Sequence, residues 1–224
     1  MTSLGILQLV SPALPVGAFS YSEGLEWLIQ NKKIVNKSSL YDWLIAELLR
    51  GQIRLEAASQ TYIRKALENC KILKDQKSLS IVQEWDSWVL ALRDSAELRK
   101  QYKQMGKSLV DLLNNLGFPL PGDIKELSWP LAWVWAGMSW NLSEIEVTQG
   151  YLYSWVANQL SAAVRLIPIG PTDAQSLQFS LLPLIESQAR DLLTKDPRNL
   201  WTGDIGATLA QISHSELYSK LFRT

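Results

Sequence analysis

The sequence predicts an all-α protein, organised as a single-domain helical bundle of roughly seven to ten helices. Apolar residues recur at helical spacing through most of the chain after residue 20, and no alternating strand pattern of useful length interrupts them. The 224 residues are 47% hydrophobic, which is enough for one sizeable core, and no linker is long enough to force a domain boundary.

The first long helix is predicted from residues 40 to 69, either unbroken or divided near Gly51. Ser38 or Ser39 ahead of it is suited to cap the first turn through its side-chain oxygen. One apolar stripe supports the helix at spacings of three and four: Tyr41, Leu44, Ile45, Leu48 and Leu49.

A second long helical segment is predicted from about Ser78 to Leu116. Gly117 follows it, where a C-cap glycine commonly stands, and "GFPLPGD" then breaks the pattern. Its apolar stripes consist of Ile81, Trp85, Trp88, Val89, Leu92 and Ala96, followed by Leu109, Leu112, Leu113 and Leu116.

The tryptophan-rich run from Leu127 to Trp140 is interpreted as a buried core helix. It spans 14 residues and contains Pro130. A membrane-spanning helix needs about 20 apolar residues, so this run is too short for one.

Two further helices and a helix-like tail are predicted after this run. Ser143 and Glu146 form a capping-box pattern for a helix that continues to about residue 166. Thr172 or Asp173 should cap the next helix, which Pro183 should kink or split. The tail "ATLAQISHSELYSKLFRT" again has the pattern of a helix.

The composition excludes several classes of protein. Twenty-two basic residues balance 22 acidic ones, so nucleic acid or an anionic membrane would feel no general attraction. The single cysteine, Cys70, excludes an intramolecular disulfide and fits a reducing compartment. The first positive charge is Lys32, so the basic start of a secretory signal is missing. We therefore expect a cytoplasmic protein that binds neither nucleic acid nor membrane.

Residues with catalytic potential are few. "MGKS" ends like a phosphate-binding loop, but the glycine needed five positions before Gly106 is replaced by Gln101. We interpret this stretch as a helix surface with a small residue at Gly106. His214 is the only histidine, and one histidine with one cysteine cannot complete a closed zinc site of the usual kind.

The remaining polar residues carry no specific catalytic signal. A serine–histidine–carboxylate triad would have to use His214, but no motif supports one. We expect His214 to be solvated or to face a partner. Glu23 and Glu26 stand at a helix start, where the helix dipole favours carboxylates. The sequence thus predicts no catalytic residue, no metal ligand and no cofactor.

The two ends of the chain carry the features of an interaction protein. Residues 1–19 form an apolar N-terminal segment, and residues 207–224 form a C-terminal docking segment. Within a helical tail, Tyr218 and Phe222 would share one face with Leu221 beside them. Lys220 and Arg223 would lie at the rim. A docking helix and a helix folded back on the core both fit this pattern.

Four ordered stretches of the chain closely resemble the UreF family of urease accessory proteins. The first is "LQLVSPALPVGAFSYSEGLEWLIQ", which is similar to the opening motif of that family. The others contain Arg99, Gln104, Met105, Gly106 and Ser108, then Ser161, Arg165, Pro168, Gly170, Asp173 and Gln175, and finally His214, Glu216, Tyr218, Leu221 and Phe222. The resemblance extends through nearly the whole chain.

The resemblance implies an all-helical, commonly dimeric protein without catalysis of its own. It implies partners: a second accessory protein, UreD or UreH, the GTPase UreG, and apo-urease. The chain would be a scaffold and chaperone that bridges these partners for GTP-dependent nickel insertion, with nickel cation binding expected of the assembly. The nucleotide chemistry would then belong to UreG.

The resemblance also suggests which residues contact partners. These candidates are Pro15, Phe19, Tyr21, Glu23, Arg99, Gln104, Arg165, Asp173, His214, Tyr218, Lys220, Leu221 and Phe222. Phe19 and Tyr21 would be aromatic contacts, although burial of both rings in the core fits equally well. Lys220 replaces a frequent arginine of the family, and lysine cannot make arginine's two-pronged pair with a carboxylate.

Two other classes of protein stay open as alternatives. One is a helical small-molecule-binding or enzymatic domain whose pocket is lined by the tryptophan-rich run. The other is an independent GTPase, which Gln101 disfavours.

Overall fold

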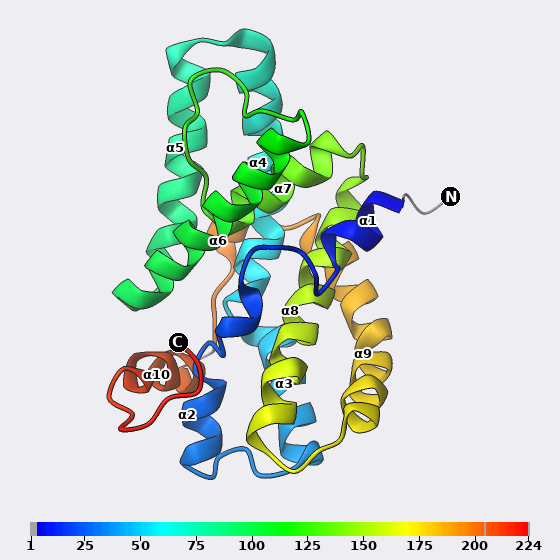
Figure 1. The fold of residues 1–224 in the computed structure, drawn as a ribbon. Coiled ribbons are helices and arrows are strands. Elements are labelled where there is room, and N and C mark those ends of the chain that lie inside the picture. The colour runs from blue at the N-terminus through cyan, green and yellow to red at the C-terminus, as the bar shows by residue number, and fades with distance from the viewer. Residues whose placement is uncertain (1–3, 204, 224) are drawn as a thin grey trace.

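The computed structural model describes residues 4–203 and 205–223, and within these ranges the chain contains helices and no β-strand (Figure 1). The predicted all-α class is therefore confirmed. The elements are, in order, α1 (Leu4–Leu9), η1 (Ala18–Ser20), α2 (Leu25–Gln30), α3 (Lys37–Arg50), α4 (Ile53–Leu73), α5 (Gln76–Ala91), α6 (Ala96–Asn115), α7 (Trp129–Ser139), α8 (Glu144–Leu166), α9 (Pro171–Leu192), η2 (Pro197–Asn199) and α10 (Ile205–His214).

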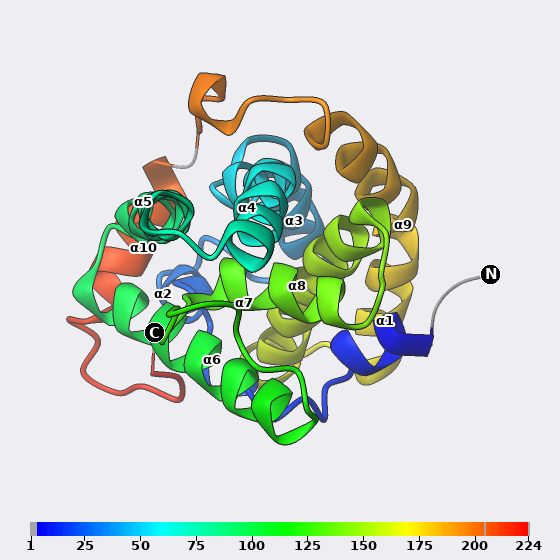
Figure 2. The same ribbon diagram turned by 90° about the horizontal axis from the view of Figure 1, so that it is seen from above.

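Helix α7 lies in the middle of the bundle. It packs against α4, α6 and α8, which surround it in both views (Figures 1 and 2). Every residue from Trp129 to Gly137 is buried, as expected of a helix that is apolar on all sides. The tryptophan-rich run is thus the core helix that its sequence predicted. Within the described ranges, the helices offer no stretch whose length and hydropathy would let it cross a bilayer.

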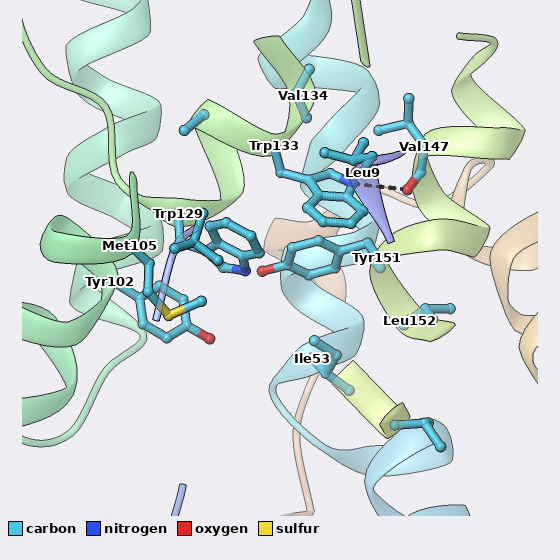
Figure 3. Packing of buried hydrophobic residues seen from close by; sticks show 14 of the residues in the cluster. Leu9, Ile53, Tyr102, Met105, Trp129, Trp133, Val134, Val147, Tyr151 and Leu152 are labelled. Carbon is cyan, nitrogen blue, oxygen red and sulfur yellow. Dashed lines mark hydrogen bonds between the residues drawn. The ribbon is translucent and has the colours of Figure 1, made fainter. Parts of the chain in front are cut away.

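Aromatic rings join α7 to α8. The Trp133 ring makes edge-on contacts with Trp129 and Tyr151, at centroid distances of 5.3 and 5.5 Å. Its indole Nε1–H donates a hydrogen bond of 3.0 Å to the Val147 carbonyl, as Figure 3 shows. This bond satisfies the one polar group of a ring that is otherwise surrounded by apolar side chains.

The first predicted long helix is divided at Gly51 into α3 and α4. Asn36, rather than Ser38 or Ser39, caps α3, because its Oδ1 accepts a hydrogen bond of 3.0 Å from the Ser39 amide. A side chain at Gly51 would overlap backbone atoms of Glu47, so glycine is required at this joint.

The second predicted segment is divided at residues 92–95, between α5 and α6. Ser95 caps α6 by accepting a hydrogen bond of 3.1 Å from the Leu98 amide. The junction places Arg93 in the interior, where it is 3% exposed. At the far end, Gly117 has a φ of 86°, the left-handed conformation expected just after a helix.

The later helices begin close to where the sequence predicted. Ser143 and Glu146 form the predicted capping box at the start of α8. Helix α9 begins at Pro171 with Gly170 as its N-cap, so Thr172 and Asp173 lie in its first turn instead of capping it. The helix continues past Pro183 to Leu192, so the expected split does not occur.

Gly106 lies where α6 passes close to the segment that precedes α7. The surrounding "MGKS" stretch is helical, as interpreted, but the expected surface position is wrong because Gly106 is buried. A Cβ atom added at Gly106 would overlap the Leu127 carbonyl and the Ser128 backbone. The absence of a side chain therefore sets how closely α6 approaches its neighbour.

We predict that Gly106→Ala lowers the free energy of unfolding by about 1–3 kcal/mol, because the backbone that it overlaps must move. Gly206→Ala is the matched control, since Gly206 also lies in a helix and an added Cβ meets nothing within 4 Å. That change should be neutral or stabilise by about 0.4–1 kcal/mol. Urea unfolding measures both, and equal effects would contradict the close approach at Gly106.

Candidate partner-binding surface

Glu26, in the first turn of α2, is a buried carboxylate that joins the two ends of the chain. Its side chain is 2% exposed. Oε2 lies 2.9 Å from Nε2 of His214 and accepts the Phe222 amide at 3.1 Å, while Oε1 accepts the Leu221 amide at 2.7 Å. Because a carboxylate taken out of water must be met by donors, these contacts hold the C-terminal segment against α2.

The segment after α10 takes a path that the sequence did not predict. The helix ends at His214, and residues 215–223 form turns and irregular backbone. Tyr218 and Phe222 therefore do not share a helix face: Phe222 is 4% exposed, whereas Tyr218 is fully exposed. The segment folds back on the core without being helical, and the Arg223 amide donates to the Ser20 carbonyl at 2.9 Å.

His214 is buried, so the expectation that it is solvated is wrong. It is 2% exposed and its ring bonds to Glu26 within the fold. Within residues 4–203 and 205–223, no three histidine, cysteine, aspartate or glutamate side chains gather in a way that could hold a metal ion. In this structure His214 therefore holds α10 against α2 through its contact with Glu26.

Arg165, near the end of α8, connects the N-terminal segment to the C-terminal one. Its Nη1 donates to the Phe19 carbonyl and its Nη2 to Oγ of Ser161, both at 3.3 Å. The guanidinium also lies 5.4 Å from the centroid of the Phe222 ring. A cation over a ring face is attracted to it, so Arg165 helps to fix both segments.

These contacts place exposed side chains from both ends of the chain on fixed backbone. Phe19 is 61% exposed, Leu221 is 60% exposed and Tyr218 is fully exposed. We call Phe19, Arg165, Tyr218 and Leu221 the composite surface. Pro15 is also exposed, whereas Tyr21 is partly buried and packs against the core, so the two rings of the opening motif differ in position.

A groove of about 450 Å³ adjoins the composite surface, between the N-terminal segment and helices α8 and α9. Leu14, Phe19 and Tyr153 are among its apolar lining residues, and Trp129 and Trp133 also line it. Arg165 is the one charged side chain among the described residues that line it. The groove therefore suits an apolar ligand or side chain more than an ion.

A second buried carboxylate, Glu56 of α4, organises the interior. It forms an ion pair with Arg93, and the two side chains are 0% and 3% exposed. Glu56 also accepts the hydroxyl groups of Tyr102 at 3.1 Å and Tyr151 at 2.5 Å. These contacts tie α4 to α6, to α8 and to the junction between α5 and α6.

Burial sets the protonation states in this cluster. Burial raises the pKa values of Tyr102 and Tyr151 well above their usual range, so both phenols remain donors to Glu56. Burial alone would lower the pKa of Arg93, but the neighbouring carboxylate of Glu56 raises it, and the guanidinium stays charged.

Glu23 lies between η1 and α2 at the edge of this cluster. Its φ of 50° turns the chain there, before α2 begins. It accepts hydrogen bonds from Trp155 Nε1 at 3.0 Å and from Gln101 Nε2 at 3.3 Å. Burial raises the pKa of the Glu23 carboxyl, against the opposing effect of Arg93. These contacts hold Glu23, and with it the opening motif, against α6 and α8.

The other candidates on the central and later motifs are exposed or partly exposed. Gln104 lies on the solvent side of α6, and Arg99 donates from Nη1 to the Arg93 carbonyl at 2.6 Å. Asp173 pairs with Lys37 at 2.8 Å, and this hydrogen bond lowers the pKa of Asp173. Lys220 donates to the Ser215 carbonyl at 2.7 Å.

Sequence reasoning did not predict the pairings that hold this arrangement together. Glu26 and His214 are 188 positions apart, and Glu56 and Tyr151 are 95 apart. No local motif links such partners. The available signal was a glutamate, Glu56, within the apolar run from Leu55 to Ala58, because a charge on a core-facing stretch needs a buried partner.

The fold and these contacts define an all-helical protein whose C-terminal segment packs against the opening motif, at Ser20 and Glu26. Comparison with known proteins identifies its family. Residues 34–182 match the UreF family model. A urease accessory protein UreF from Prochlorococcus marinus is 42% identical over 217 residues, covering 96% of this chain and 95% of the relative.

Further relatives cover the same extent. Urease accessory protein UreF from Microcystis aeruginosa is 39% identical over 221 residues, covering 99% of this chain and 97% of the relative. The protein of that name from a Nostoc species is 38% identical over 225 residues, covering 99% and 95%. The chain therefore belongs to the UreF family of urease accessory proteins.

We predict that Glu23→Gln changes how stability depends on pH. The folded-state pKa of Glu23 is raised above its ordinary value of 4.5, so its stabilising contribution is fully present below pH 4.5. That contribution is lost as the pH rises through the folded-state value. Glutamine does not titrate. The melting temperature of the variant, relative to the unchanged protein, should therefore rise from pH 4.5 to neutral pH. A constant difference would contradict the assignment.

We predict that Arg93→Met lowers the free energy of unfolding by about 3–5 kcal/mol, because Glu56 is left as an uncompensated buried charge. Adding Glu56→Gln should recover part of that loss, since the glutamine oxygen still accepts from the tyrosines. Arg190→Met is the control: it breaks an exposed pair with Glu186 and should cost about 0–1 kcal/mol. Urea unfolding is measured for the unchanged protein, the Arg93→Met and Glu56→Gln single variants, the double variant and the Arg190→Met control. Simple additivity of Arg93→Met and Glu56→Gln would refute the pairing.

Proposed function

We propose that the chain is a scaffold and chaperone of urease maturation. It bridges a UreD- or UreH-type accessory protein and a UreG-type GTPase during GTP-dependent nickel insertion into apo-urease. Membership of the UreF family supports the accessory role. The bridging role is supported by the composite surface, because exposed apolar side chains on backbone fixed by buried hydrogen bonds lose little freedom on binding.

In this proposal the chain performs no catalysis. Residues 105–108 lie inside α6, where the backbone amides are engaged in the helix. The nucleotide chemistry accordingly belongs to the GTPase. We further propose that the whole chain, residues 1–224, acts as one domain, forms a homodimer and works in the cytoplasm.

The outer face of α10 extends the proposed docking segment, residues 207–224. Ile205, Leu209 and Ile212 are 75%, 55% and 45% exposed. Their spacing of four and three places them on one side of the helix, which is the pattern of a helix that lies in an apolar groove. We propose that the UreD- or UreH-type partner covers this face together with Tyr218 and Leu221.

The direct test is the mass of the complex. The purified chain is mixed with the UreD- or UreH-type protein and the UreG-type GTPase of the same host, with and without nucleotide. Light scattering on a sizing column should give a defined complex with two copies of each protein. A chain that remains alone in every mixture would contradict the bridging role.

We predict that Phe19→Ala and Tyr218→Ala each weaken formation of that complex while the melting temperature stays within about 1 °C of the unchanged protein, because surface changes away from special features shift stability little. Phe222→Ala provides the contrast. Its ring is 4% exposed, and truncating a buried phenylalanine costs about 3–5 kcal/mol. Normal complex formation by both surface variants would show that the composite surface does not bind the partners.

A further inference from the structure

A small cavity of about 10 Å³ lies between α10 and the Glu56–Arg93 pair. Its lining comes from α3, α4, α6, α8, α10 and the junctions beside them, through residues such as Trp43, Gln52, Trp155 and Gln211. The cavity is separate from the larger groove beside Phe19, whose lining residues are different. Its volume is close to that of a single water-sized probe.

Four side chains that line this cavity carry buried polar atoms without a hydrogen-bond partner in the described part of the chain. Two are donors, Nε1 of Trp43 and Nε of Arg93, and two are acceptors, Oε1 of Gln52 and Oε1 of Gln211. The Gln52 amide is oriented by its own Nε2, which donates to Asp94 at 2.9 Å. This contact assigns the nitrogen end of the Gln52 amide to Asp94, so Oε1 is the end that is left without a partner.

Such atoms are costly if nothing meets them. A buried donor or acceptor without a partner destabilises a fold by about 1–3 kcal/mol, and native proteins pair nearly all of them with protein or ordered water. Two donors and two acceptors complement one water molecule, which accepts two hydrogen bonds and donates two. An anion would face the two amide oxygens together with the carboxylates of Glu23, Glu47 and Glu56. A cation would leave the two donors, Nε1 of Trp43 and Nε of Arg93, without an acceptor.

We infer that this cavity binds one ordered water molecule, which links Gln211 of α10 to Trp43, Gln52 and Arg93. The water is a structural ligand of the chain, independent of any protein partner. It adds a polar attachment for α10, whose buried side chains are otherwise Ala207, Ala210 and His214. The helix that leads into the C-terminal segment is thus joined to the core at His214 and, through water, at Gln211.

The test uses the ¹⁵N-labelled full chain and water-selective rotating-frame NMR. The Trp43 indole N–H should show a direct cross-peak to long-lived water. Trp133 is the internal control, because its buried Nε1–H already bonds to Val147 and should show no such peak. Trp43→Phe assigns the signal. Absence of the Trp43 cross-peak, or an equal peak at Trp133, would overturn the inference.

A second measurement separates water from an ion. Gln211→Met removes one acceptor and should reduce the Trp43 cross-peak at least twofold, whereas Gln83→Met on the exposed side of α5 should leave it unchanged. A Trp43 signal that moves with sodium or ammonium concentration would mean that the cavity holds a cation instead. Equal cross-peaks in the two variants would exclude Gln211 as a ligand and overturn the proposed link.

Discussion

A carboxylate that leaves water must be met by donors, and this constraint acts at Glu56 and at Glu26. Glu56 gathers Arg93 and two tyrosine hydroxyls from three neighbouring parts of the chain. Glu26 gathers His214 and two backbone amides from the C-terminal segment. The first cluster joins α4 to α6 and α8. The second holds Leu221 and Phe222 against α2.

The arrangement explains how a protein with few catalytic signals can present a defined face. The opening motif has a buried side, represented by Ser22 and Glu26, and an exposed side, represented by Phe19. The C-terminal segment is divided in the same way, since Phe222 is buried while Tyr218 is exposed. In the proposed scaffold role, this face is where another protein binds.

The sequence predicted the helical class, the core position of the tryptophan-rich run and the break near Gly51, because periodicity, capping boxes and glycines act locally. It predicted a solvated or partner-facing His214 and a helix face shared by Tyr218 and Phe222, because the surroundings of His214 and Phe222 depend on Glu26, far away in the chain. It also joined α5 to α6, since the helical pattern does not reveal that Arg93 turns inward to meet Glu56. Long-range pairing of charges was the information that local patterns could not supply.

The hydrogen bonds of Glu26 to the C-terminal segment hold that segment in place. Hydrogen–deuterium exchange of the full chain, resolved residue by residue, measures how strongly these bonds protect the backbone amides of the segment. The Leu221 and Phe222 amides, which donate to Glu26, should exchange at least tenfold more slowly than those of Tyr218 and Lys220. Uniformly rapid exchange from residue 215 to 223 would show that the segment is not held, and it would contradict the composite surface.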